Sequence, residues 1–517
     1  MFNKTEAIIE ERNAVRKDYR KVDLKIAFCY PSIYRAGMSS LGLQLIYRLF
    51  NSYPQIACER SFLPQKETTV PYTLESDQPL KRMDVIAFTL QFEDNYTNVL
   101  DILHRSNIPL ESKKRTEKDP LIIAGGPTVQ ANPTPLKPFI DGFMLGDIEP
   151  IVDKLLIEGL LENNSKEGQI ETLNTFPWMW IPSIEPQKEV TFAPKGDINN
   201  YFYPVRQIIP QVDDVDPWHG VFGKTFMLEV VRGCSRNCAF CLTGKLNTPR
   251  RDRTLQKCQQ LYREGVKHCE VNKITIIGSG IADYPELIPL CQSIVEDDLQ
   301  FSLPSMRADR ITPELMQLLV KSGQRTITTA PEAATQRLRD KICKNLTTEE
   351  ILQATTIVNA SGLSRIKYYF MLGLPSETEE DIEGLVEFGE KISQMTSNMR
   401  SVNISCSNFI PKAHTQFQNV SINSIKESKA TGKKIRKDLN RIPGITCDVY
   451  SSNWTPIQTM LSIGGEEIAP CIKLAMLYGK NLGAWRRAIK ETNLNLEKYT
   501  TKRKPTDQNP WDFITIG

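Results

Sequence analysis

Apolar and polar residues alternate in blocks along the first part of the chain. Short apolar runs separated by longer amphipathic stretches predict buried strands joined by helices. A helical stripe of Leu41, Leu43, Ile46 and Leu49 follows the first run. The predicted strands are 24–28, 85–88, 121–124 and 142–145. This α/β alternation predicts a parallel, doubly wound (Rossmann-like) sheet domain for residues 1–160.

Ligands of doubly wound sheets bind beyond the carboxyl ends of the strands. The sequence 125–127, Gly-Gly-Pro, breaks the third strand sharply at such an end. We therefore expect binding groups in the loops that follow the predicted strands, at 30–40, 89–95, 125–130 and 146–149.

The rest of the chain divides into three parts. Residues 161–220 are rich in proline and aromatic residues and predict a packed connector, because a flexible tether would lack such apolar anchors. Residues 221–420 alternate strand and helix again, and residues 421–517 predict a mainly helical extension. The second set of predicted strands is 225–231, 274–277, 301–303, 326–329, 366–372 and 403–409. Six such units predict a partial (β/α)6 barrel, with its chemistry at the carboxyl ends of the strands.

Composition narrows the class of protein. The 517 residues carry a formal net charge of +3, too little to favour nucleic acid as a partner. No apolar run approaches the ~20 residues of a membrane span, and the N-terminus is not signal-like. We expect a cytoplasmic protein without an integral membrane segment, with a peripheral position at a membrane as the alternative. The 12 cysteines lack a disulfide rhythm and are expected to be mostly free thiols.

Three cysteines stand apart from the others. Cys234, Cys238 and Cys241 lie within eight residues, directly after the first predicted barrel strand. This spacing lets three thiolates converge on one iron–sulfur cluster and leaves one iron without a protein ligand, as a reactive site requires. A zinc site would need a fourth ligand, and the closest histidine, His219, precedes the strand. Structural cysteines seldom form such a tight group on a loop.

The C-x3-C-x2-C pattern, with Phe240 before the last cysteine, resembles the motif of the radical S-adenosylmethionine (SAM) superfamily. The resemblance implies a 4Fe–4S cluster on Cys234, Cys238 and Cys241, with SAM bound to the open iron. In that family, an electron from a donor of the ferredoxin or flavodoxin type cleaves SAM to a 5′-deoxyadenosyl radical, which abstracts hydrogen from the substrate. The cofactors carry the difficult chemistry, and the protein orients them and excludes water.

Other segments resemble the strand ends of the same family and imply contacts with SAM. Arg307 lies in a third-strand segment, where an arginine can bind the SAM carboxylate, although an ordinary surface role explains it equally well. Glu332 lies in the fourth-strand segment and is also explained as a helix-start acid. Gly373 would let a backbone approach the adenine. At the second strand the sequence lacks the acid that many members carry. The implied cofactor-binding residues are Gly278, Gly280, Ser305, Arg307, Glu332 and Gly373.

The N-terminal part resembles the cobalamin-binding-type domain of this superfamily, through segments such as 125–127 and 141–149. Uncharacterised radical SAM proteins of the same architecture resemble nearly the whole chain. The Asp-x-His-x-x-Gly pattern that supplies a lower cobalt ligand is absent, and the histidine of this part, His104, lies on a predicted helix. Cobalamin is therefore expected without a histidine ligand, or not at all.

These observations leave several functions to compare. Cobalamin-assisted methylation of an unreactive carbon is the leading hypothesis, with a small-molecule or lipid substrate. The alternative is radical carbon–carbon bond formation, as in the cyclopentane rings of archaeal tetraether lipids. A tRNA methylthiotransferase is disfavoured, because the N-terminal half has only Cys29 and Cys58, too few for a second cluster. The intact triad disfavours a non-enzymatic scaffold. Tyr368, Tyr369 and Cys406 are candidate hydrogen-atom donors, although core packing explains each more simply.

Overall fold

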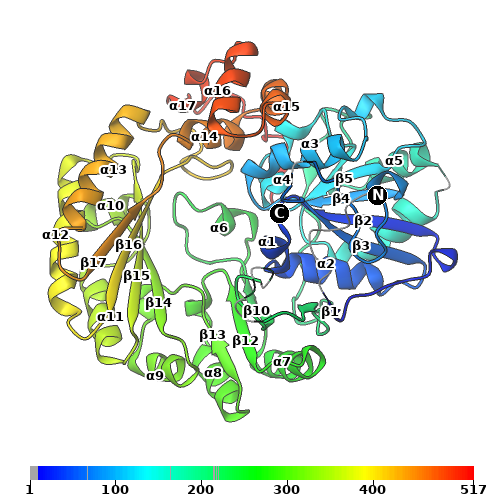
Figure 1. Ribbon diagram of the computed structural model, residues 1–517. Helices are drawn as coiled ribbons and strands as arrows, with labels where there is room; N and C mark the ends of the chain where they lie inside the picture. Colours follow the sequence, from blue (N-terminus) through cyan, green and yellow to red (C-terminus); the bar gives the residue numbers. More distant parts are fainter. Residues whose placement is uncertain (1–9, 67, 164, 214–215, 217, 219) are drawn as a thin grey trace.

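The computed structural model describes residues 10–66, 68–163, 165–213, 216, 218 and 220–517. It consists of an N-terminal sheet domain, an arc of barrel strands, and C-terminal helices that return to the first domain (Figure 1). Within these residues no helix is long and apolar enough to cross a membrane. His219 lies outside the described residues.

The N-terminal sheet has the strand order β3-β2-β4-β5-β6-β7. Strands β2 to β6 are parallel, and β7 joins the edge antiparallel. Their bounds are Leu24–Tyr30 (β2), Ile56–Phe62 (β3), Val85–Thr89 (β4), Leu121–Gly125 (β5), Gly142–Met144 (β6) and Met179–Trp180 (β7). The order reverses between β2 and β4, and the crevice at such a reversal is the usual ligand site of a doubly wound sheet. The predicted Rossmann-like domain is confirmed, with β3 and β7 in addition.

Helices cover both faces of this sheet. One face packs against α2, the π-helix η7 and α5, while the other packs against α3 and the C-terminal helices α14, α15 and α16. The bounds are Leu41–Asn51 (α2), Tyr96–Arg105 (α3), Lys154–Leu161 (η7), Lys166–Thr175 (α5), Thr455–Ile463 (α14), Ala469–Leu477 (α15) and Leu482–Glu491 (α16). The C-terminal helices α14, α15 and α16 therefore complete the core of the N-terminal domain, which they lie beside in Figure 1.

Short elements tie the connector to both ends of the chain. Strand β8 (Val190–Thr191) pairs with β18 (Ile514–Thr515), and β9 (Ile209–Pro210) pairs with β1 (Glu11–Arg12). The short helices are Tyr34–Met38 (α1), Pro127–Ala131 (α4), Leu242–Leu246 (α6) and Glu497–Thr500 (α17). The predicted connector is thus packed against the rest of the chain.

The barrel strands form an arc in chain order, β10-β12-β13 followed by β14-β15-β16-β17, and all of these pairs are parallel. Their bounds are Phe226–Arg232 (β10), Lys273–Gly278 (β12), Gln300–Ser302 (β13), Thr326–Glu332 (β14), Arg365–Leu372 (β15), Ser401–Asn408 (β16) and Ile445–Val449 (β17). A bridge between Met306 and Thr329 joins the two groups, and β11 (Arg251–Asp252) adds to β10 antiparallel. The predicted partial barrel is confirmed. Strand β17 extends it from within the helical extension, where sequence analysis predicted helix.

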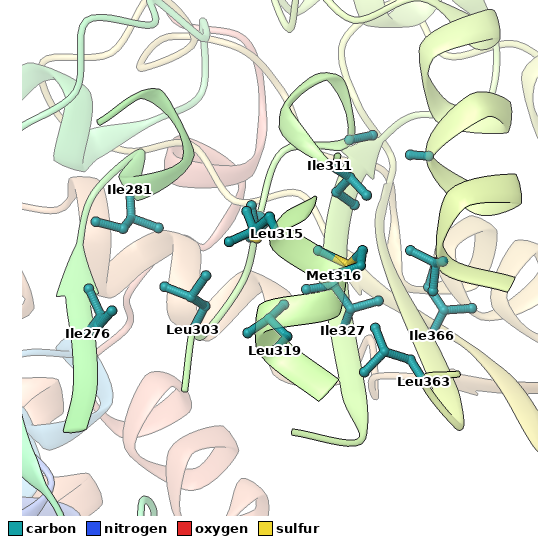
Figure 2. Packing of buried hydrophobic residues seen from close by; sticks show 14 of the residues in the cluster. Ile276, Ile281, Leu303, Ile311, Leu315, Met316, Leu319, Ile327, Leu363 and Ile366 are labelled. Atoms are coloured by element: carbon teal, nitrogen blue, oxygen red, sulfur yellow. The ribbon is translucent and has the colours of Figure 1, made fainter. Parts of the chain in front are cut away.

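Amphipathic helices follow the strands and cover the outer face of the arc. Figure 2 shows Leu315, Met316 and Leu319 of one such helix, α9, beside Leu303 and Ile327, where the two groups of strands meet. The bounds of these helices are Leu255–Cys269 (α7), Leu287–Glu296 (α8), Pro313–Lys321 (α9), Gln336–Lys341 (α10), Thr348–Ala360 (α11), Glu379–Met395 (α12) and Ile425–Leu439 (α13). Apolar packing therefore closes the outer side where backbone pairing is sparse.

The sharp break after β5 requires glycine at one of its two positions. Gly126 has φ 102° and ψ 172°, a region that side-chain-bearing residues almost never adopt. A Cβ there would also lie 2.6 Å from the carbonyl oxygen of Leu90. At Gly125 the nearest atom to a Cβ would be 3.6 Å away, an ordinary contact.

We expect Gly126→Ala to lower the free energy of unfolding by at least about 2 kcal/mol, because it combines a strained backbone with a clash. Gly125→Ala is the matched control and should change the free energy by less than half as much. Urea unfolding followed by circular dichroism compares the two variants. Equal losses would contradict the backbone argument.

Candidate functional site

The three clustered cysteines lie on the loop that leaves β10, and Cys241 directly precedes α6. Cys238 is buried, while Cys234 and Cys241 are half-buried. Burial raises the pKa of Cys238 and of Cys241, and the neighbouring charge of Cys234 adds to the rise at both thiols. Among the described residues, no three His, Cys, Asp or Glu side chains meet closely enough to hold a single metal ion. A 4Fe–4S cluster has a different requirement, since each cysteine binds its own iron.

The cysteine loop crosses from the first barrel strand toward the last ones. Gly233, with φ 89°, starts the crossing in a turn so tight that a Cβ would lie 2.0 Å from the Asn247 carbonyl oxygen. The amide of Ala239 donates to the Ile342 carbonyl at 2.9 Å. Phe240 packs in a small apolar cluster at the carboxyl ends of β14, β15 and β16, formed by Ala333, Leu338, Ile342, Met371, Leu374 and Phe409. The three thiols are therefore held over the mouth of the barrel.

The two predicted glycines at the end of β12 lie against the exit of β10 and the cysteine loop. Gly280 has φ 68°, and a Cβ there would be 3.1 Å from the sulfur of Cys234. A Cβ at Gly278 would be 3.1 Å from Val231 of β10. The absence of a side chain at Gly280 brings the backbone close to Cys234. Close approach of both glycines to the amine of SAM stays a prediction.

Three other residues implied to contact SAM, Arg307, Ser305 and Gly373, lie on the loops that follow β13 and β15. The Arg307 guanidinium donates to Asp309 at 2.9 Å and to the carbonyls of Lys344 and Asn345 at 3.0 and 2.8 Å. It braces the turn after α10. Ser305 is exposed at the mouth. Gly373 follows β15 with φ 77°, and its amide donates to Glu377 at 2.7 Å.

Glu332, the last residue of β14, is paired with a lysine that sequence analysis missed. The ammonium of Lys344 lies 3.3 Å from the Glu332 carboxylate and 5.9 Å from the centre of the Phe240 ring. Burial raises the pKa of Glu332, and the lysine charge opposes this rise. Lys344 sits between Cys343 and Asn345, both of which have positive φ. This tight turn, which no sequence pattern marks, turns a buried ammonium toward Cys238 and Cys241, whose pKa values its charge lowers against burial.

A cavity of about 560 Å³ lies between the N-terminal sheet and the barrel. Its lining comes from every loop that the sequence placed at the ligand edge, and from the exits of β10, β12 and β13. The deep part is an apolar slot between the sheet and α2, lined by Ile26, Phe28, Leu45, Phe50, Val85, Ala87, Ile123 and Met144. The rim is polar and rich in glycine, with Gly42, Gly125, Gly126, Gly146, Asp147, Glu149, Glu229, Arg232 and Gly278. The described residues that line this cavity include neither histidine nor cysteine.

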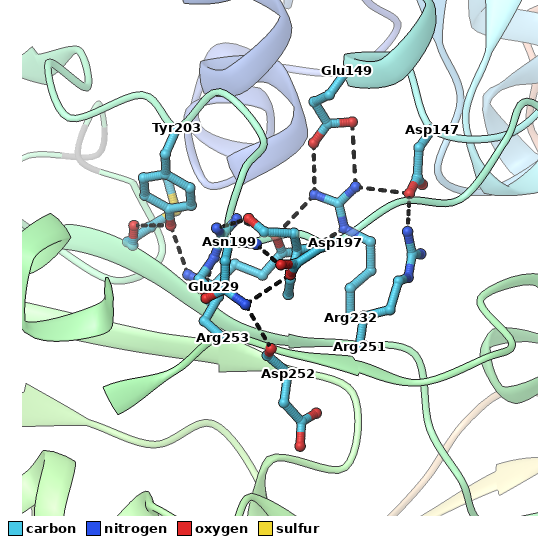
Figure 3. A network of polar contacts seen from close by, with 12 residues as sticks. Asp147, Glu149, Asp197, Asn199, Tyr203, Glu229, Arg232, Arg251, Asp252 and Arg253 are labelled. Carbon is cyan, nitrogen blue, oxygen red and sulfur yellow. Dashed lines mark hydrogen bonds and ion pairs between the residues drawn. The ribbon is translucent and has the colours of Figure 1, made fainter. Parts of the chain in front are cut away.

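A network of largely buried charges fixes this rim (Figure 3). Arg232, the last residue of β10, bonds Glu149 at 2.8 Å, Glu229 at 2.9 Å and Asp147 at 3.2 Å. Arg251 bonds the same Asp147 at 2.6 Å. Burial opposes the ionisation of Asp147, but Arg232 and Arg251 outweigh it and hold its pKa below the usual range. The network thus joins the exit of β6 to the residue two places before Cys234.

The strand alternation separates the candidate hydrogen-atom donors. Tyr368 is fully buried on the helix side of β15, where its hydroxyl lies 2.6 Å from that of Thr355. Cys406 is also buried in the outer core. Tyr369 alternates with these positions and is 37% exposed on the inner side. Cys29 and Cys58 are buried against opposite faces of the N-terminal sheet, so they do not form a second cysteine site.

Comparison with known proteins agrees with this architecture. A family model described as "Radical SAM superfamily" matches residues 228–389, and one described as "Radical SAM proteins, N-terminal" matches residues 42–182. The uncharacterized protein MJ0966 of Methanocaldococcus jannaschii is 30% identical over 96% of this chain and 100% of its own length. The chain belongs to the radical SAM superfamily. It is therefore an enzyme whose family cofactors are a 4Fe–4S cluster and SAM.

More distant relatives match parts of the chain. An uncharacterized methyltransferase of Pyrococcus horikoshii, PH0819, is 22% identical over 54% of this chain and 60% of its own length. The ribosomal protein uS12 methylthiotransferase RimO of Protochlamydia amoebophila is 25% identical over 46% of this chain and 53% of its own length. Among solved structures, the methyltransferase TsrM of Kitasatospora setae has a TM-score of 0.49 at 12% identity, covering 77% of both chains. The cobalamin-dependent enzyme OxsB also scores 0.49, at 13% identity over 71% of this chain and 52% of its own.

Removing the charge of Arg232 should destabilise the contact between the N-terminal domain and the barrel. Arg232→Gln leaves Asp147, Glu149 and Glu229 buried without their shared partner, and we expect a loss of about 3–5 kcal/mol in the free energy of unfolding. Urea titration measures it. The control is Arg263→Gln, which removes an exposed pair with Asp297 and should cost less than about 1 kcal/mol. Similar losses of unfolding free energy in both variants would show that the Arg232 network stabilises the protein no more than an exposed ion pair does.

Proposed function

We propose that this chain is a cobalamin-assisted radical SAM methyltransferase that modifies an unreactive carbon. One observation carries the proposal. The cavity between the two domains is lined both by the ligand edge of the Rossmann-like sheet and by the strand exits beside the cysteine loop. A substrate at that position contacts both parts of the protein.

We assign the cluster to Cys234, Cys238 and Cys241. The donor set fits, because three neighbouring thiols on one loop leave an iron open for a small ligand. When bound, the cluster supplies the electron that cleaves SAM. The chain's own residues hold the loop over the barrel mouth, keep Gly280 against Cys234 and exclude water with the Phe240 cluster. A reducing donor of the ferredoxin or flavodoxin type is the partner that this assignment requires.

For SAM, we propose Lys344 as the residue that binds the carboxylate. It is a buried ammonium close to the thiols, and its carboxylate partner Glu332 is 3.3 Å away, which leaves donors for a second oxygen acceptor. Arg307, for which the sequence suggested this contact or an ordinary surface role, holds the turn that carries Lys344 and stays a prediction for SAM binding. Gly278, Gly280 and Gly373 would let the protein backbone approach SAM closely. Ser305 and Glu332 stay predictions for its polar groups.

For cobalamin, the deep slot supports binding without an imidazole ligand. It is apolar, lies on one face of the sheet, and opens at the glycine-rich edge between β2 and β4. Such a slot suits a flat aromatic heterocycle, and the polar rim suits the amide groups of a corrin ring. Bound there, cobalamin would supply the methyl group. Carbon–carbon bond formation, as in lipid cyclisation, is the second candidate, because the same apolar slot also suits an alkyl chain.

The cluster assignment is tested by iron content after anaerobic reconstitution. We expect about four iron atoms per chain, and less than one in Cys234→Ala. Cys343→Ser, a half-buried thiol outside the triad, should keep the full content. The amount of 5′-deoxyadenosine formed from SAM should rise and fall with the iron content of each variant. A Cys234→Ala chain with full iron, or equal loss in Cys343→Ser, would refute the assignment.

The cobalamin assignment is tested by filling the slot. Ala87 is half-buried on the sheet face that lines it, so Ala87→Phe should block cobalamin and lower its affinity at least tenfold. The visible spectrum of the reconstituted chain measures binding, and the wild type should show cobalt without an imidazole ligand. Formation of 5′-deoxyadenosine in the variant is the internal control for an intact barrel. Wild-type protein that cleaves SAM but never binds cobalamin would favour the second candidate.

A further inference from the structure

Arg236 lies inside the cysteine loop, two residues after Cys234, and is held by acids from neighbouring strand exits. Its guanidinium donates twice to Asp283, at 2.8 and 2.6 Å, and once to Asp309 at 3.4 Å. A two-point bond between planar groups fixes orientation as well as distance. Asp283 follows β12 and Asp309 follows β13, so the loop is anchored to two strands other than its own.

The anchoring acids are themselves fixed. Asp283 is 8% exposed and receives a further bond from Arg310 at 2.9 Å. Burial opposes its ionisation, but the bonds and charges of Arg236 and Arg310 lower its pKa to about 2. Arg307 holds Asp309 at 2.9 Å. Asp283 therefore stays charged at neutral pH, and together with Asp309 it holds Arg236 in place before any cofactor binds.

The position of Arg236 matters because of what lies beside it. Its backbone amide donates to the sulfur of Cys234 at 3.4 Å, so the residue that carries the guanidinium directly contacts this cluster ligand. Hydrogen bonds to ligand sulfurs and nearby charge are the protein's means of setting the potential of an iron–sulfur cluster. A fixed cation favours the form of the cluster that carries one more electron.

We propose that Arg236 is a positioning residue whose guanidinium, clamped by Asp283, holds the Cys234 end of the loop and makes the cluster easier to reduce. This inference rests on the proposed binding of the cluster by Cys234, Cys238 and Cys241. The electron that enters comes from the external donor, and no bond to Arg236 forms or breaks.

The chain offers a matched pair of variants for this proposal. Arg236→Gln and Arg310→Gln each remove one cation from Asp283, but Arg310 is 52% exposed and bonds the acid from the side of β13. In a redox titration with electron paramagnetic resonance detection, Arg236→Gln should lower the ratio of reduced to oxidised cluster about tenfold at fixed potential. This corresponds to 59 mV for one electron. Arg236→Lys should recover most of the loss, and Arg310→Gln should match the wild type. Equal shifts for Arg236→Gln and Arg310→Gln, or none, would overturn the proposal.

Hydrogen exchange of the cluster-free chain tests the clamp separately. Residues 234–241 should exchange about tenfold faster in both Arg236→Gln and Asp283→Asn, with no further gain in the double variant, because both remove the same contact. Arg310→Gln should stay like the wild type. Unchanged exchange in the single variants would overturn the clamp. The iron content of the reconstituted wild type tests the cluster assignment independently. If the wild type binds about four iron atoms but the exchange rates do not change, only the clamp is refuted.

Discussion

The shared ion pairs of Arg232 are the constraint on which the rest of the site depends. One guanidinium meets carboxylates from the exit of β6 and from its own strand, at a point two residues before Cys234. Buried charges are tolerated only when their partners are complete, so this contact admits little variation in geometry. It therefore brings the ligand edge of the N-terminal sheet to face the barrel mouth, and the cavity between them follows from that contact.

The C-terminal helices secure the same arrangement from the other side. Helices α14 and α15 pack on the face of the N-terminal sheet opposite the apolar slot, while β17 extends the barrel. Lys412, at the exit of β16, bonds Glu93 of the N-terminal domain at 2.6 Å. The two domains are thus joined at β10 by a largely buried charge network and at β16 by a half-buried ion pair and a returning chain. Such support on two sides keeps the loops at the rim in fixed positions, as a preorganised site requires.

Sequence patterns predicted what is local and missed what is paired across distance. The apolar strands and the cysteine triad were predictable, because each is a continuous pattern. Strand β3 was not, because its middle carries Glu59 and Arg60; the latter is buried and paired with Glu11 and Glu75, far away in the sequence. Strand β17 is short and lies in a helical tail. Lys344 escaped detection because only the folded turn brings it to the thiols. Arg307 was predicted either to bind SAM or to be an ordinary surface residue, and no sequence pattern reveals its contacts with two backbone carbonyls.

The placement of the cavity also bears on the choice between the candidate reactions. Its lining joins the glycine edge of the Rossmann-like sheet to the exits of β10, β12 and β13, so anything bound there lies between two ligand edges. Hydrogen abstraction alone needs one of them, the barrel mouth. Methyl transfer also needs a methyl donor, which must reach the substrate carbon from the side opposite the barrel mouth. The ligand edge of the Rossmann-like sheet, with the apolar slot behind it, provides a place for such a donor. Cyclisation leaves the slot to be filled by the substrate itself, which would then have to be apolar along most of its length. The polar rim of Asp147, Glu149, Glu229 and Arg232 suits an amide-bearing ring better than an alkyl chain, and this favours methyl transfer.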